Sequence, residues 1–418
     1  MGRMTDAPHA PPATPAVTGR LLLALIVGQL ALHAAMAGQR MAAPLQALKA
    51  GHSAWTVGLL LALFAAFPVL TALASGRLAD RHGYHRPVEL AVGLTMLGAA
   101  LAVAGCWTRG MASIALLAAG AAASGIGTNV GLIAVQRTAG HMVSSGTERL
   151  RVFSWLGMAP SLANVVGPVV AGFVIDAGGF AWAYAVMMVL PLGSLWASRA
   201  VPAEAGRVVA AATESRGRAW DLLQVPGLKR LLVVNWLLSA SWDVHSFAVP
   251  VLGHARDYSA STIGLVLGSF TLAVTAVRFV IPLMAHRLNE VAVLRSAMVL
   301  TGLVFAAYPF AGTPWMMGAC ATLLGLTLGS VQPMIMSTLH HLTPPSRHGE
   351  AIAFRSMAIN ASSSVMPMAF GVAGTALGPG VMFWIMGAAV AAGSWVAGGL
   401  RRWFDDEHAQ GGETPPGT

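Results

Sequence analysis

The stretch SAWTVGLLLALF (residues 53–64) recurs as SASTIGLVLGSF (residues 259–270), an offset of 206 residues without a gap. Seven of the twelve positions are identical, and they include a serine, a threonine and a glycine as well as apolar residues. At the same offset, Ala79 and Arg81 align with Ala285 and Arg287. Apolar segments share leucines by chance, but shared polar and glycine positions indicate that the two halves of the chain are copies of one unit.

Around this repeat, apolar runs of about 20 residues, enough to cross a bilayer, recur along the whole chain. Apolar residues make up 56% of the 418 and charged residues only 10%, against roughly 25% charged in a typical soluble domain. The pattern predicts an all-α membrane protein with twelve transmembrane helices, at about 20–39, 55–74, 88–107, 112–135, 152–175, 181–199, 230–251, 260–280, 292–310, 315–337, 351–374 and 381–400.

The longest polar stretch, residues 200–229, divides these spans six and six. We therefore expect a disordered tail (1–19), an N-terminal six-helix bundle (20–199), a linker (200–229), a C-terminal six-helix bundle (230–400) and a second tail (401–418). Two bundles in parallel repeat are a transporter architecture, in which the solute site lies between the bundles near the middle of the membrane.

The positive charge is distributed unevenly between the two sides of the predicted membrane. With both termini on one side, the opposite side holds only Arg40, Lys49, Arg109 and Arg256 of the 25 lysines and arginines. Basic residues concentrate in cytoplasmic loops, so both termini are predicted to be cytoplasmic, as in a bacterial inner-membrane protein. The net charge of +9 then reflects topology, and no nucleic-acid partner is expected.

This sequence lacks the motifs that are typical of several other classes of protein. Cys106 and Cys320 lie in or at the end of apolar spans and indicate neither a disulfide framework nor a metal site. No lysine stands in a phosphate-binding loop, and no HExxH or GxSxG motif occurs, so neither a nucleotide-driven pump nor an enzyme is expected. The histidines of HHLTPPSRHGE (340–350) lack a metal-ligand spacing. We expect a monomer without cofactors or metals, whose partners are lipid, protons and a small-molecule substrate.

GRLADRHGYHRP (76–87), which follows the second span, resembles the signature loop of the major facilitator superfamily. Gly76, Asp80, Arg81 and Gly83 occupy signature positions, and Arg86 follows where Tyr84 and His85 replace the usual basic pair. The resemblance implies two six-helix bundles and a latch, in which the aspartate closes the cytoplasmic side through charge and helix-dipole interactions. The second copy of the loop has His286 in place of Asp80, so the implied latch is asymmetric.

ANVVGPVVAG (163–172), in the fifth span, resembles a motif of the proton-coupled drug and metabolite exporters of that superfamily. Gly167, Pro168 and Gly172 match the motif, whereas Ala163 and Ala171 replace glycines. The arginine that the exporter pattern has in the fourth helix is absent, because span 112–135 has no charged residue. Small residues in this stretch also suit simple helix packing.

Asp243 is the only acidic residue near the middle of a predicted span. Even on the mildest scale a central aspartate costs about 2.5–3.5 kcal/mol, so it needs a partner, water or a proton. Asn235, Ser239, Asp243 and Ser246 follow helical spacing and form one polar stripe. Burial favours the neutral form of a carboxylate, and Asp243 is therefore our candidate for the coupling proton. A structural aspartate and a direct ligand for a cationic substrate remain alternatives.

In the first span Gln29, His33 and Arg40 share one face, with Arg40 near the outer end. Gln29 and Arg40, like Asn235 and Ser239 of the seventh span, are candidates for the substrate cavity. The resemblance implies that the first and seventh helices both line the central cavity, so His33 is a candidate proton partner of Asp243, or else a packing residue. His245 is rotated about 200° from Asp243 on its helix and is expected to point elsewhere.

Other polar residues are weaker candidates. Trp242 is a candidate for the cavity wall, and Arg278 and Arg355 are expected to extend from the spans toward the cytoplasmic surface. Four amides can bond either the substrate or neighbouring helices: Asn129, Asn164, Gln332 and Asn360.

These features predict a secondary active transporter that works by alternating access. A proton-coupled antiporter that exports an amphipathic or cationic compound is the first interpretation. A proton symporter that imports a small metabolite such as a carboxylate is the alternative, and it would require a cationic group deep in the cavity.

Overall fold

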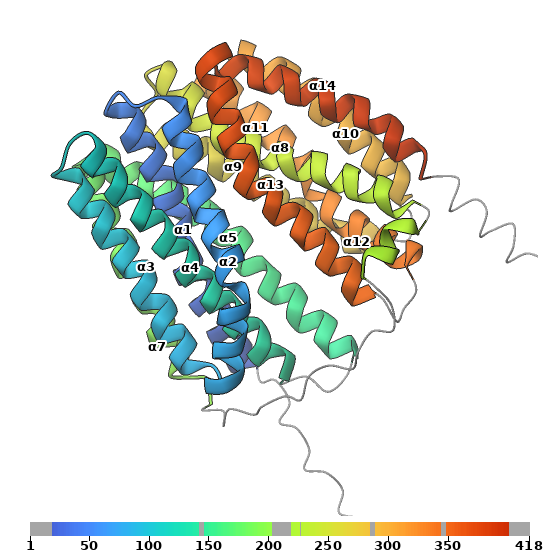
Figure 1. Cartoon of the computed structure of the whole chain (residues 1–418), viewed down its shortest axis with the longest axis horizontal. Coiled ribbons are helices and arrows are strands. Elements are labelled where there is room, and N and C mark those ends of the chain that lie inside the picture. Colours follow the sequence, from blue (N-terminus) through green and yellow to red (C-terminus); the bar gives the residue numbers. More distant parts are fainter. Residues whose placement is uncertain are drawn as a thin grey trace, which may run out of the picture.

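The computed structural model describes residues 19–141, 146–202, 219–225, 227–284, 289–343 and 348–400. The expected tails (1–19, of which only Gly19 is described, and 401–418) and most of the expected linker lie outside these residues, as does His286. Within the described part every regular element is helical (Figure 1).

The N-terminal half contains α1 (Gly19–Lys49), α2 (Ala54–His82), α3 (His85–Cys106), α4 (Met111–His141), α5 (Gly146–Gly178), α6 (Phe180–Val189) and α7 (Leu192–Ser198). After the short η1 (Ala219–Gln224), the C-terminal half contains α8 (Leu228–Ala255), α9 (Ala260–Met284), α10 (Glu290–Ala307), η3 (Tyr308–Phe310), α11 (Pro314–Gly329), α12 (Val331–Leu342), α13 (His348–Leu377) and α14 (Pro379–Gly398).

Two of the predicted spans are interrupted helices. The sixth span consists of α6 and α7, which are separated at Leu190 and Pro191, and the tenth consists of α11 and α12, which are separated at Ser330. A proline cannot donate to the carbonyl four residues earlier, and Pro191 and Pro333 lie at or just after these breaks. Counted in this way, the described helices form twelve rods, six in each half, and the predicted all-α membrane fold is confirmed.

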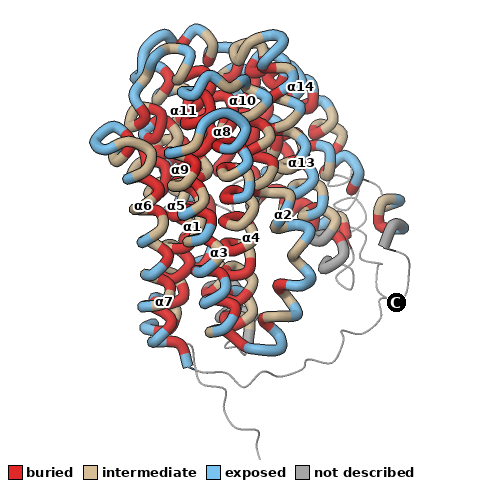
Figure 2. The backbone as a smooth tube through the Cα atoms, turned by 60° about the vertical axis from the view of Figure 1, so that its left-hand side comes forward, coloured by how far each residue is buried: buried red, intermediate tan, exposed pale blue. Residues whose placement is uncertain are grey.

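Ten of the twelve described rods are long and apolar enough to cross a membrane by length and composition. The other two, α8 and α13, have 28 and 30 residues and carry the buried polar residues discussed below. Buried residues concentrate along the inner helices (Figure 2). Large apolar side chains such as Leu303 and Trp395 are exposed, as expected where a protein meets lipid.

The quoted repeat lies where the two bundles meet. α2 packs against α13 and α5 packs against α9. A Cβ atom at Gly58 would meet the Pro367 carbonyl of α13, and one at the repeat-related Gly264 would meet the Pro168 carbonyl of α5. The same glycine in each copy therefore permits the close approach of one bundle to the other.

These contacts close one face of the molecule. We call the face where α1 begins and α14 ends the terminal face, and the other the opposite face. Near the opposite face, Trp55 N donates to Thr375 Oγ1 at 3.2 Å, and the Asp176 carboxylate accepts from Ala260 N and Ser261 N at 3.0 and 2.8 Å. Toward the bottom of Figure 1, α2 and α13 diverge. The bundles are thus joined at the opposite face.

Candidate functional site

A cavity of about 330 Å³ lies between the bundles, bounded by α1, α8, α9, α11, α12 and α13. Most of its lining residues are polar or charged, and Asn235, Ser239 and Asp243 of the stripe predicted on α8 form one of its walls. The polar and aromatic lining residues are Arg40, Asn235, Ser239, Trp242, Asp243, Arg278, Gln332, Arg355 and Ser363.

Asp243 is 3% exposed and accepts hydrogen bonds from two serines of α13. Ser363 Oγ lies 3.2 and 3.3 Å from its two carboxylate oxygens, and Ser362 Oγ lies 3.4 Å from one of them. The Arg40 guanidinium of α1 is near enough to attract the carboxylate electrostatically. Asp243 thus bonds to α13 of its own bundle and is attracted by a charge of the N-terminal bundle.

Arg40, a candidate residue of the central cavity, lines this cavity although it lies beyond the predicted end of the first span. α1 continues to Lys49, ten residues beyond the predicted end at residue 39, and carries Arg40 into the cavity wall. Pro44 lies inside this helix without ending it. The Arg40 Nε is buried and has no hydrogen-bond partner among the described residues. An unsatisfied buried donor is costly, and a bound anion would satisfy it.

Arg278 and Arg355 differ from their expected positions, because both line the cavity. Arg355 is 8% exposed, and its Nε donates to Asn235 Oδ1 at 3.1 Å. Arg278 donates to Ser161 Oγ of α5 at 2.9 Å and to Gln332 Oε1 at 3.1 Å. Three arginines and one aspartate thus line one cavity, so the lining carries an excess of positive charge.

His33 and Gln29 are on α1 but are not among the residues that line this cavity. His33 Nδ1 and both polar atoms of the Gln29 side chain are buried without a hydrogen-bond partner in the described part of the chain. Arg40, rather than His33, is the α1 group that interacts with Asp243. His245 is fully buried, and its Nδ1 lies 3.5 Å from the Tyr308 hydroxyl.

Two of the candidate amides lie away from the cavity. Asn129 Nδ2 donates to the Pro68 carbonyl at 3.3 Å and joins α4 to α2. Asn360 is exposed on α13. Both were assigned to the cavity from their depth along a predicted span, which does not determine the direction in which a side chain points. Trp242 faces the cavity and packs edge-on against Phe270, with ring centroids 4.6 Å apart.

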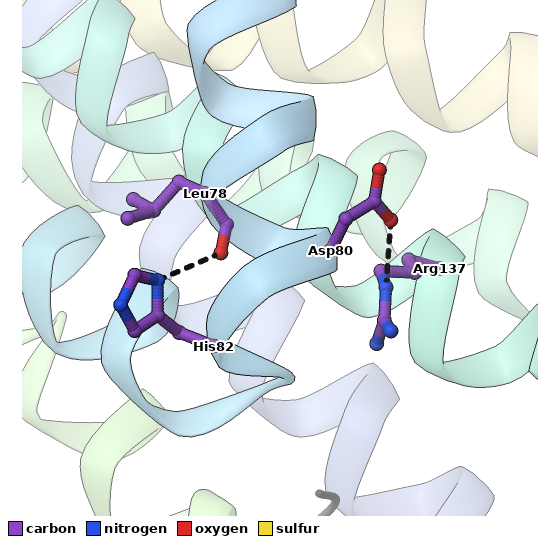
Figure 3. A network of polar contacts seen from close by, with 4 residues as sticks. All are labelled: Leu78, Asp80, His82 and Arg137. Atoms are coloured by element: carbon purple, nitrogen blue, oxygen red, sulfur yellow. Dashed lines mark hydrogen bonds and ion pairs between the residues drawn. The ribbon is translucent and has the colours of Figure 1, made fainter. Parts of the chain in front are cut away.

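The signature loop lies at the terminal face. Asp80 pairs with Arg137 of α4, with 3.0 Å between Oδ1 and Nε, and His82 Nδ1 lies 3.3 Å from the Leu78 carbonyl (Figure 3). Gly83 ends α2 with φ 67°, a conformation that favours glycine. The remaining predicted latch residues have these positions: Gly76 has open space around its α carbon, and Arg81 and Arg86 are exposed.

The fifth-span motif forms packing surfaces on both sides of α5. A Cβ at Gly167 would lie 2.8 Å from Gly38 N of α1, and one at Gly172 would lie 2.9 Å from the carbonyl carbon of Ala260 of α9. Pro168 provides the carbonyl that faces Gly264. These residues allow the close approach of α5 to α1 and α9.

Three site residues on α13 were missed, although the sequence contained a signal for them. Arg355, Ser362 and Ser363 are separated by seven and eight residues, two helical turns, and therefore share a face. No group of three or more potential metal ligands occurs among the described residues.

Comparison with known proteins gives a consistent result. The family model described as Major Facilitator Superfamily matches residues 25–228 and 231–417. The chain is 34% identical to the class B tetracycline resistance protein of Escherichia coli over 116 residues, which are 28% of this chain and 27% of that protein. The match thus spans about a quarter of the curated relative.

Solved structures share the fold over nearly the whole chain. A bacterial homologue of the iron transporter ferroportin, in an inward-facing state, is 15% identical, with a TM-score of 0.72 over 92% of this chain and 98% of that one. A human organic anion transporter is 16% identical, with a TM-score of 0.62 over 90% of this chain and 99% of that one. At these identities the likeness concerns the fold alone.

Proposed function

The chain belongs to the Major Facilitator Superfamily of membrane transporters, and we propose that it carries a small organic anion, such as a carboxylate, together with protons. The observation that supports this proposal is the positive charge of the cavity. Arg40, Arg278 and Arg355 line it together with a single acidic residue, Asp243.

A guanidinium binds a carboxylate through paired hydrogen bonds, and these are strong where water is scarce. A cationic substrate would enter a site with three arginines and be repelled by them. The deep cationic group that the import alternative required is present, and we therefore prefer an anion to a cationic compound as substrate.

Asp243 is the group that we assign to the coupling proton. Its carboxylate is buried, and its charge is compensated by Arg40 and two serines. A substrate anion that binds Arg40 would withdraw this compensation, and a proton on Asp243 would then restore neutrality. Substrate and proton would in this way occupy the site together, as symport requires.

Export by antiport remains the second candidate, and one observation favours it. The partial similarity to a tetracycline resistance protein suggests an exporter relationship, in line with the fifth-span resemblance. With both termini in the cytoplasm, as the charge distribution predicts, the closed opposite face would be external and the site would be reached from inside.

The test is the substrate-induced pH change in proteoliposomes, measured with carboxylates and with organic cations. Wild-type protein is compared with Asp243→Asn and with Asp257→Asn. The control changes an exposed aspartate at φ 55°, a conformation that asparagine also tolerates.

We expect carboxylates to carry protons with them in wild type and in Asp257→Asn, and not in Asp243→Asn. Proton release driven by cations would instead support the exporter. Carboxylate uptake whose proton flux is unchanged in Asp243→Asn would remove the coupling role of Asp243 but leave anion transport standing.

A further inference from the structure

A second cavity, of about 660 Å³, lies between α5, α9 and α12. It shares Arg278 and Gln332 with the central cavity. We call it the side chamber. Arg278 and Gln332 therefore stand at the boundary between the two cavities.

The side chamber differs from the central cavity in chemistry. Apart from the shared residues, Ser161 and Thr275, its walls are apolar or aromatic and include Phe153, Trp155, Met158, Phe279 and Met336. Trp155 and Phe279 are 44% and 53% exposed, so the chamber reaches the protein surface. Methionine and aromatic walls adapt to apolar groups of varied shape.

Arg278 stands at the junction of the two cavities. Its Nη1 donates to Ser161 and its Nη2 donates to Gln332, which fixes the guanidinium in place. A guanidinium has five N–H donors, and no other hydrogen bond of Arg278 occurs within the described residues. Donors therefore remain for an anion at the mouth of an apolar chamber.

We propose that the side chamber binds the apolar part of the substrate, so that the transported molecule is an amphiphilic anion. Its anionic group lies in the central cavity, which both Arg40 and Arg278 line, and its chain or ring lies between α5 and α9. This inference rests on the proposed anion transport and specifies its substrate class.

The chamber predicts a dependence of affinity on chain length. Each methylene that leaves water for an apolar site tightens binding about fourfold. Three methylenes buried in the chamber would thus favour octanoate over propionate by about 50-fold. A site without the chamber would bind the two carboxylates with similar affinity.

Gly157 provides a way to fill the chamber selectively. It lines the chamber, and a Cβ atom added there meets nothing within 4 Å. Gly157→Phe therefore places a ring in the chamber without a backbone clash. Gly93→Phe is the matched control, because Gly93 is an exposed helical glycine of α3 with the same open space. Met158→Ser makes the wall polar without adding volume and is the second variant.

The experiment measures binding of labelled octanoate to the protein in lipid nanodiscs, with empty discs subtracted, and its displacement by propionate. We expect octanoate to bind about 50-fold more tightly than propionate in wild type and in Gly93→Phe. Gly157→Phe should reduce this ratio to below about fivefold and leave the propionate affinity within about twofold, with Met158→Ser intermediate. Arg278→Gln should weaken both ligands.

Two results separate failure of this inference from failure of the proposed function. If propionate and octanoate bind with equal affinity, or if the octanoate preference survives in both chamber variants, the chamber does not hold the substrate. If neither carboxylate binds to the wild-type protein, the anion-transport proposal itself is refuted.

Discussion

Replacing Asp176 by alanine is expected to open the opposite face of the protein. The two carboxylate oxygens of Asp176, near the end of α5, accept from the first two backbone N–H groups of α9, Ala260 N at 3.0 Å and Ser261 N at 2.8 Å. α5 and α9 belong to different bundles, so this cap exists only while the opposite face is closed.

The magnitude follows from the chemistry of a helix cap. A capping side chain contributes about 0.5–2 kcal/mol, and a negative charge at a helix N-terminus contributes about 0.3–1 kcal/mol. Since Asp176 is exposed, we take about 1–2 kcal/mol for the two effects together. Asp176→Ala should therefore shift the ratio of open to closed molecules by about 5- to 30-fold. Asp176→Asn keeps an acceptor but loses the charge, and should give a smaller shift.

The assay is a distance measurement between spin labels at Arg109→Cys and Gly312→Cys, in exposed loops of the two bundles at the opposite face. The free Cys106 and Cys320 are first replaced by alanine. Glu89→Ala, which removes an exposed carboxylate from α3, is the control. Molecules whose two spin labels are far apart have an open opposite face. If the fraction of such molecules changes by less than about twofold in Asp176→Ala, this estimate of the free energy that the cap contributes is refuted.

Three further substitutions test the packing and the signature loop. Gly58→Val would place a side chain against the Pro367 carbonyl, and this overpacking of about 1–3 kcal/mol should enlarge the fraction of molecules whose two spin labels are far apart. Asp80→Asn removes the pair with Arg137, which is worth at most about 1 kcal/mol, so the melting temperature should barely change while transport falls if Asp80 acts as a latch. Gly83→Ala places a residue with a Cβ at φ 67°, a strain that costs about 1–3 kcal/mol of folding free energy. This substitution should lower the melting temperature by a few degrees. Thermal unfolding and uptake in proteoliposomes check the last two.

The fold could be predicted because membrane insertion leaves a strong signal in sequence. Each rod must be apolar over its length, and the six-plus-six division follows from the position of the polar linker. The polar stripe on α8 could also be predicted, since helical spacing fixes which residues share a face. Asp243, Asn235 and Ser239 accordingly line the cavity together.

The arginines could not be placed from sequence, because hydropathy does not determine where a helix ends or which way it leans. α1 has 31 residues, about 46 Å of helix, and therefore exceeds the roughly 30 Å of hydrocarbon. An arginine assigned to the surface can lie deep in the protein when a helix is tilted or overlong. Arg278 is such a case, because its position near a span end assigned it to the cytoplasmic surface. Arg40 likewise lies in the cavity although it is beyond the predicted end of its span.

The repeat itself indicates which parts of the molecule can remain symmetric. Pro44 of α1 and Pro250 of α8 match at the offset of 206 residues, so the alignment holds through both helices. At this offset the counterpart of Asp243 is Ala37, and the counterpart of Arg40 is Ser246. The copies therefore agree at the glycines that join the bundles and differ at the charges in the cavity.

Both interfaces between the bundles need the same close backbone approach, which the same small residue provides. The substrate that we propose, a small organic anion, has one charged end and lacks the pseudo-twofold symmetry of the site. Binding it in one orientation requires that the two halves of the site carry different charges, and Arg40 and Asp243 are where they do.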